Sequence, residues 1–155
     1  MSYADTTGPG PAWTSPATTD GVIGRRLLAY LVDIVVLFMF TLFLGFLIGL
    51  AGFVTFGLSW TLYAVLVPGA ALLYAAMTVG GAAQATPGMR MMGVSIHDAA
   101  TGGPPGPLIA AGHALLFYVA AGTFFLLVLD VAIGLMREDR RLGHDLLAGV
   151  VALRR

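Results

Sequence analysis

Residues 27–50 read LLAYLVDIVVLFMFTLFLGFLIGL, and this stretch decides what kind of protein the chain forms. Its one formal charge is Asp33. A bilayer core about 30 Å thick is crossed by about 20 helical residues, so the run is long enough and apolar enough to span it. We therefore expect a transmembrane helix over residues 27–50.

The apolar pattern continues beyond this helix, because no other formal charge occurs before Arg90. A second span fits at about residues 58–80, joined to the first by the glycine-flanked segment 51–57. The two helices should form an antiparallel hairpin. Pro68 lies midway along the second span and predicts a kink, since proline cannot donate the helical hydrogen bond.

Composition supports a membrane protein and excludes several other classes. The 155 residues are enough for one domain, and they are 58% hydrophobic and 10% charged, against roughly 45–50% and about 25% in soluble domains. A small soluble fold could not hide so much apolar surface. The zero net charge gives no reason to expect nucleic acid, and the absence of cysteine excludes disulfides and thiolate chemistry. The lipid bilayer is the expected partner.

The regions outside the spans carry weaker signals. Residues 1–20 are rich in Pro, Thr, Ser, Gly and Ala, which predicts a flexible tail before a membrane domain over residues 21–155. Thr86-Pro87-Gly88 predicts the start of a short interfacial helix, with Thr86 as its N-cap. Short strands are predicted near Val94 and Val150, the second one after a helical turn over residues 143–149.

The third apolar segment, residues 108–136, would be about 43 Å long as one helix, which exceeds the bilayer core. Arg25 and Arg26 predict a cytoplasmic N-terminus. A single third crossing would place five C-terminal arginines outside, against the same rule. The segment is therefore either a crossing helix or a re-entrant hairpin that turns at residues 120–123, and the sequence leaves both open.

The expected fold is an all-α membrane protein of three apolar segments. It consists of a two-helix transmembrane hairpin, the crossing or re-entrant segment 108–136, a short interfacial helix and a small β pairing at the cytoplasmic face. We expect it in a bacterial plasma (inner) membrane.

Asp33 is the leading candidate for chemistry, because a carboxylate in a span costs roughly 2.5–3.5 kcal/mol on insertion scales. It would either handle protons or cations, or anchor neighbouring helices. Arg26 lies seven residues earlier on the same face, but helical side chains lean toward the N-terminus and hence away from Asp33. The partner of Asp33 should come from another segment, and Arg90 is the expected one.

Other polar residues in apolar runs have simpler expected roles. We expect Asp130 to lie at the interface and His113 to make a helix–helix hydrogen bond. His144 and Asp145 are adjacent and point apart on a helix, with no third ligand at a suitable spacing, so the sequence predicts no metal site and no cofactor. No catalytic motif such as a Walker loop or HExxH occurs, which argues against an enzyme.

Small residues at four-residue spacing lie in both spans, as Gly45/Gly49 and Ala71/Ala75. Such residues let helix backbones approach in lipid. Packing within the hairpin explains both pairs, and a homo-oligomer is only weakly indicated.

Three segments in this order resemble the RDD family of membrane proteins. They are residues 26–33 (RLLAYLVD), 84–94 (QATPGMRMMGV) and 140–150 (RRLGHDLLAGV). The resemblance implies that Arg26 is the family arginine, Asp33 the first family aspartate and Asp145 the second. It also implies a link to transport, since members have been suggested to move unidentified ligands or to exchange monovalent cations for protons.

Two functions follow as hypotheses. In the first, the chain acts in transport as an oligomer or with another membrane protein, with Asp33 titrating and Arg26 and Arg90 tuning it. In the second, it is a non-transporting interaction or assembly module, in which Arg26, Asp33, Arg90 and Asp145 form one structural polar knot.

Overall fold

The computed structural model describes residues 19–155. The flexible tail predicted for residues 1–20 therefore lies outside the described residues, except for Thr19 and Asp20. The chain is mostly helical, with a small two-stranded sheet.

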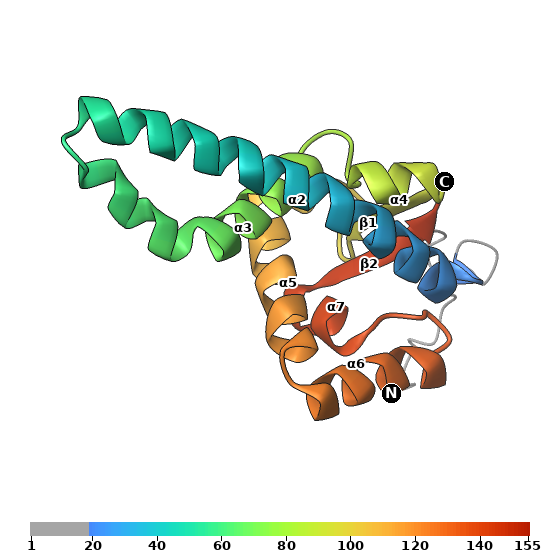
Figure 1. Ribbon diagram of the computed structural model, residues 1–155. Coiled ribbons are helices and arrows are strands. Elements are labelled where there is room, and N and C mark those ends of the chain that lie inside the picture. The colour runs from blue at the N-terminus through green and yellow to red at the C-terminus, as the bar shows by residue number, and fades with distance from the viewer. Residues whose placement is uncertain (1–18) are drawn as a thin grey trace, which may run out of the picture.

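A long helical hairpin projects from the rest of the molecule (Figure 1). Its first arm is the α-helix α2 (Val22–Val54), and its second arm consists of the 3-10 helix η2 (Leu58–Val65) followed by the α-helix α3 (Leu66–Thr78). Both arms are long and apolar enough to cross a membrane. At 1.5 Å per residue, α2 is about 50 Å long, which exceeds the bilayer core.

Pro68 lies in the first turn of α3, directly after the 3-10 helix ends. An α-helix running through this point would need a hydrogen bond from residue 68 to the carbonyl of Ala64, and proline has no N–H to donate. The irregularity predicted at Pro68 therefore takes the form of a change in helix type.

Aromatic side chains of η2 pack against the glycines of α2. The Tyr63 hydroxyl donates to the Gly45 carbonyl at 2.8 Å, and Trp60 Nε1 donates to the Gly49 carbonyl at 3.3 Å. A Cβ at Gly49 would lie 3.0 Å from the Tyr63 hydroxyl oxygen. The glycine pair thus serves close packing within the hairpin, as predicted.

The predicted short elements form at the base of the hairpin. They are the helices α4 (Pro87–Met91) and α7 (Gly143–Ala148) and the strands β1 (Val94–Asp98) and β2 (Val150–Arg154). Thr86 caps α4 by accepting a hydrogen bond from the Met89 N–H at 3.1 Å. The strands pair antiparallel, from Val94 opposite Arg154 to Asp98 opposite Val150, which confirms the predicted pairing.

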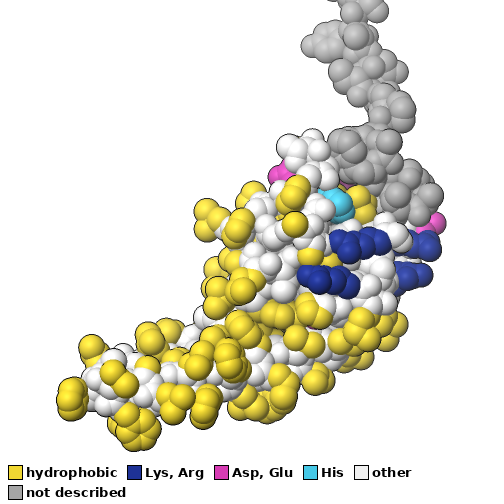
Figure 2. Space-filling model, turned by 90° about the horizontal axis from the view of Figure 1, so that it is seen from above, with side chains coloured by type: hydrophobic (Ala, Val, Ile, Leu, Met, Phe, Trp, Pro, Cys, Tyr) yellow, Lys and Arg dark blue, Asp and Glu magenta, His cyan; other side chains and the backbone are white. Residues whose placement is uncertain are grey.

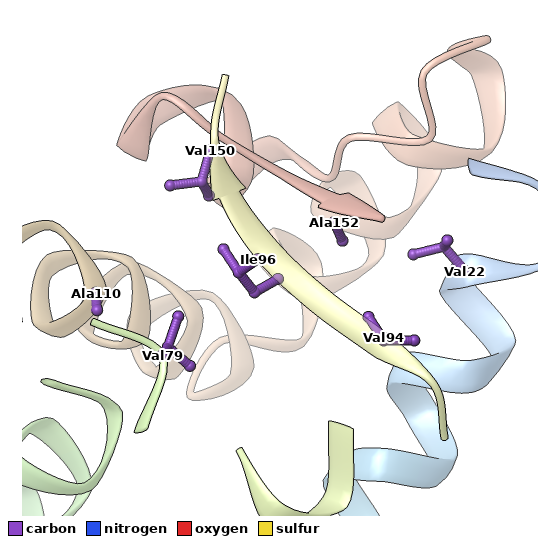
Figure 3. Close-up of a cluster of buried hydrophobic side chains, with 7 residues drawn as sticks. All are labelled: Val22, Val79, Val94, Ile96, Ala110, Val150 and Ala152. Carbon is purple, nitrogen blue, oxygen red and sulfur yellow. The ribbon is translucent and has the colours of Figure 1, made fainter. Parts of the chain in front are cut away.

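A buried apolar cluster joins the sheet to three helical regions (Figure 3). It draws side chains from both strands, from the first turn of α2, from the end of α3 and from α5. Its members are Val22, Val79, Val94, Ile96, Ala110, Val150 and Ala152. The base of the molecule therefore has a core of its own.

The third apolar segment is broken. The helices α5 (Gly106–Ala121) and α6 (Phe124–Met136) are bent by 119° at Gly122 and Thr123, within the predicted turn at residues 120–123. Thr123 is extended, with φ −129° and ψ 106°, so the helix cannot continue through it. Figure 1 shows α5 running from α3 down to α6, which turns away from it. The described chain thus has two helices able to span a membrane, or three if the bent pair counts as one.

Candidate functional site: two buried polar clusters

Five titratable side chains meet beneath α7, and we call them the Asp145 cluster. They come from α2, α5, α6 and α7, and each is at least nine-tenths buried. Its members are Arg26, His113, Asp130, His144 and Asp145. Segments far apart in the sequence therefore supply one polar site.

Asp145 is the centre of this cluster and is fully buried. Arg26 binds it in a bidentate manner, with Nη1 donating to Oδ2 and Nη2 donating to Oδ1, the latter at 2.9 Å. His113 Nε2 donates to Oδ1 at 2.7 Å, and the Leu142 N–H donates to Oδ2 at 2.9 Å. Burial raises the pKa of Asp145, but the charge of Arg26 and the hydrogen bonds from His113 and Arg26 outweigh it and hold the pKa well below its usual range.

His144 links the second carboxylate to the same arginine. Its backbone N–H donates to Asp130 Oδ1 at 2.6 Å, and its Nδ1 donates to Asp130 Oδ2 at 2.8 Å. With the proton on Nδ1, a neutral imidazole accepts at Nε2, where Arg26 Nη2 lies 3.1 Å away. Burial lowers the pKa of His144, which favours this neutral form.

The charges of the Asp145 cluster do not cancel. Asp130 and Asp145 carry two negative charges and Arg26 carries one positive charge, so the cluster is negative when both imidazoles are neutral. Buried charge is costly unless it is balanced, so the ionic and hydrogen-bonded contacts among these five side chains stabilise one another within the base of the molecule.

A second polar site surrounds Asp33, and we call it the Asp33 cluster. The Asp33 carboxylate accepts from the Tyr74 hydroxyl at 2.7 Å, from the Gly88 N–H at 2.9 Å and from the Thr86 hydroxyl. A Cβ at Gly88 would lie 2.2 Å from the Ala29 carbonyl oxygen, so only glycine lets α4 approach this closely. Asp33 thus fastens the start of α4 and the middle of α3 to α2.

Two expectations about charged residues were wrong. Arg90 makes no ion pair with Asp33 within the described residues, because its Nε donates to the Ala85 carbonyl at 3.3 Å. The start of α4 faces Asp33, whereas Arg90 lies near the other end of that helix. Asp130 is buried against His144. The single polar knot is therefore two clusters, and Arg90 belongs to neither.

His113, His144 and Asp145 each offer a ligand atom within 4.8 Å of the others, so the tertiary structure supplies the third ligand that the sequence lacks. Arg26, however, holds both oxygens of Asp145 and faces the free nitrogen of His144. A metal ion here would have to displace a guanidinium of the same charge sign. The donor set therefore fits Arg26 better than a metal.

His113 makes the helix–helix hydrogen bond expected of it, from α5 to Asp145 of α7, and Asp130 joins the same cluster through His144. The available signal was their position as single polar residues in otherwise apolar helices. Nothing in the sequence indicated that both would meet α7, since 32 residues separate His113 from Asp145.

Two helices long and apolar enough to cross a membrane, with charged side chains buried at the base of the hairpin, indicate an integral membrane protein. The RDD family model matches residues 21–149 of the chain. The chain therefore belongs to the RDD family. No curated protein and no solved structure gives a significant match.

Proposed function

We propose that the chain is a subunit of a proton-linked membrane transporter, with the Asp145 cluster as its protonation site. The observation that carries this proposal is the buried set of two carboxylates, two imidazoles and one guanidinium that contact one another. Exchange of a monovalent cation for a proton, suggested for some family members, would use such a group.

The sequence-based transport hypothesis made Asp33 the titrating group, whereas the present proposal gives it a structural role. Its carboxylate already accepts three hydrogen bonds, and neither Arg26 nor Arg90 contacts it within the described residues. We assign it to the packing of α4 on α2, and the proposed proton-handling role passes to the Asp145 cluster.

The transport pathway is proposed to form between copies of the chain or with another membrane protein. Two hollows on the described surface, one between α2 and η2 and one along α6, are lined by apolar side chains. Such hollows suit lipid rather than ions.

We also propose that both ends of the membrane domain lie on the cytoplasmic side. If the two arms of the hairpin cross, β1 lies on the same side as the start of α2. Since β2 pairs with β1, it lies there too, and the bent pair α5–α6 must enter and leave by one face. This topology keeps all eight arginines on the side favoured by the positive-inside rule.

The test is proton flux in liposomes that contain the purified chain and a pH-sensitive dye, driven by a Na⁺ or K⁺ gradient. We expect His113→Gln and His144→Gln to reduce flux at least tenfold, because each removes a titratable group from the Asp145 cluster. His97→Gln is the matched control, since His97 bonds Ser95 and the Gly102 carbonyl outside the cluster. Flux that is unchanged in both cluster variants would contradict the assigned site.

A second candidate function is a non-transporting assembly module. It is favoured by the way each cluster joins separate elements: Asp33 ties α4 to α2, and Arg26 with Asp145 ties α7 to α2. In that case the wild-type chain drives no proton flux, and Asp33→Asn or His113→Gln alters function only in proportion to the amount of folded protein in the membrane. A stable, abundant but inactive His113→Gln chain would exclude this candidate.

A further inference from the structure

Four exposed arginines gather at the base of the hairpin, and we call them the arginine surface. They come from the first turns of α2, from α4 and from the C-terminal end of the chain. Figure 2 shows dark blue side chains grouped on one part of the molecule, bordered by the yellow apolar surface that continues along the hairpin. The members are Arg25, Arg90, Arg154 and Arg155.

Hydrogen bonds between distant segments bring these arginines together. Arg25 Nη1 donates to the Met92 carbonyl at 2.8 Å. The Arg155 N–H donates to the Gly93 carbonyl at 2.9 Å, and Arg154 is the last residue of β2, next to that bond. The end of α4 is therefore enclosed by arginines from both ends of the membrane domain.

Among the described residues, no aspartate or glutamate side chain forms an ion pair with the arginine surface. The ion pairs among residues 19–155 that include an arginine are those of Arg26 and Arg137, and no member of the arginine surface takes part in one. Asp20 precedes α2 and forms no ion pair with them. Asp33 lies behind α4 and already accepts three hydrogen bonds.

Exposed apolar side chains lie next to these arginines in the sequence. On α2, Leu27 and Leu28 are 63% and 53% exposed, and on α4 Met91 is 69% exposed. Exposed apolar side chains beside guanidinium groups are typical of the boundary where hydrocarbon meets lipid headgroups. The arginine surface would therefore lie at headgroup level when the hairpin is inserted.

We propose that the arginine surface binds the phosphate groups of anionic phospholipids. A guanidinium presents a planar fork of N–H donors that matches phosphate oxygens. The Arg154 side chain makes no hydrogen bond within the described residues, and Arg90 uses only Nε, which leaves both of its Nη groups available. The negative potential of a cytoplasmic leaflet attracts such residues.

The test counts lipids bound to the purified full-length chain by native mass spectrometry, with phosphatidylglycerol and phosphatidylcholine at equal concentrations. The variant is Arg90→Gln/Arg154→Gln, because neither side chain bridges distant segments. Each arginine near an anionic surface is worth about fivefold in binding, so we expect the preference for phosphatidylglycerol to fall about 25-fold. Should this variant fail to fold, Arg154→Gln alone should lower the preference about fivefold.

The matched control is Arg137→Gln/Arg140→Gln, which removes the same charge from the loop after α6. There Arg137 pairs with Asp139, and Arg140 Nη1 donates to the Leu135 carbonyl. We expect the lipid preference of this control to stay within twofold of the wild type. An unchanged preference in the folded test variant, an equal loss in the control, or equally effective competition by inorganic phosphate or by an acidic peptide would each overturn the proposal.

Discussion

At the scale of single residues, Gly88 decides whether Asp33 can hold α4. The backbone of α4 touches α2 at this point, with a hypothetical Cβ only 2.2 Å from the Ala29 carbonyl oxygen and 2.8 Å from the Asp33 carboxyl carbon. Both atoms belong to α2: the first is a backbone carbonyl oxygen, and the second is part of the buried Asp33 side chain. Within residues 86–88, Thr86 therefore caps α4, and Gly88 lets the backbone of α4 lie close to α2.

We predict that Gly88→Ala destabilises the protein by about 1–3 kcal/mol, the usual cost of overpacking. Thermal unfolding in detergent measures this. Gly112→Ala is the matched control, because its Cβ would meet no atom within 4 Å and alanine is the better helix former, so the stability of this variant should stay the same or rise slightly. Equal unfolding temperatures for the two variants would refute the close contact at Gly88.

His144 makes stability depend on pH, because burial lowers its pKa from the ordinary value of 6.5. Below about pH 6.5 the unfolded chain binds a proton at this residue that the folded chain does not, so stability falls as pH falls. Above that pH His144 contributes no such dependence. Asp145, with its lowered pKa, adds a second loss below its ordinary pKa of 3.8.

We predict that the unfolding temperature falls between pH 7 and pH 5, and that His144→Gln makes this dependence shallower. Unfolding scans at several pH values in one detergent measure the slope. His97→Gln should keep the wild-type slope, since His97 lies outside the Asp145 cluster. An identical slope in wild type and His144→Gln would show that His144 does not titrate differently on folding.

At the scale of elements, the Arg26–Asp145 pair ties the first span to the C-terminal helix α7. The pair is almost wholly buried, with side-chain exposures of 10% and 0%. Removal of one partner from a buried pair leaves the other charge uncompensated, which costs roughly 3–5 kcal/mol. Arg26 and Asp145 are therefore one structural unit that joins α2 to α7.

We predict that Arg26→Gln and Asp145→Asn each destabilise the protein by about 3 kcal/mol or more, and that the double variant loses less than the sum of the two. A double-mutant cycle based on unfolding in detergent measures the coupling. The exposed pair of Arg137 and Asp139 is the control, and its removal should cost no more than about 1 kcal/mol. Additive effects of Arg26→Gln and Asp145→Asn would exclude a direct pair.

At the scale of the whole molecule, the sheet links the middle of the membrane domain to its C-terminal part. The strand after α4 pairs with the last strand, so both lie on one side of any membrane that the hairpin crosses. The bend of 119° between α5 and α6 is consistent with a segment that enters and leaves by the same face.

We predict that single cysteines introduced at Thr101 and Arg155 react with a membrane-impermeant maleimide from one side, and that one at Thr55 reacts from the other. The chain has no native cysteine, so each label reports one position. Thr101 follows β1, and Thr55 lies at the tip of the hairpin. Labelling of the Thr101 and Arg155 positions from opposite sides would contradict the proposed topology.

The sequence by itself determined the elements, because their signals are local. The long apolar runs defined the first two spans, and Thr86 and Pro87 defined the start of α4. Gly122 and Thr123 marked a possible break in the third apolar segment, where α5 and α6 meet. The three motifs likewise identified the family, which the match over residues 21–149 shows. Each of these depends on residues within a few positions of one another.

Only the tertiary structure decided which charges meet. Arg26 contacts Asp145, which lies 119 residues later, and Asp33 contacts Gly88, which lies 55 residues later. Neither pairing can be predicted from spacing in the sequence. The expected partnership of Asp33 with Arg90 failed because the backbone N–H and the hydroxyl at the start of α4 reach the carboxylate first. Buried charges in an apolar fold are costly unless they are paired, and the packing of the helices decides which charges pair.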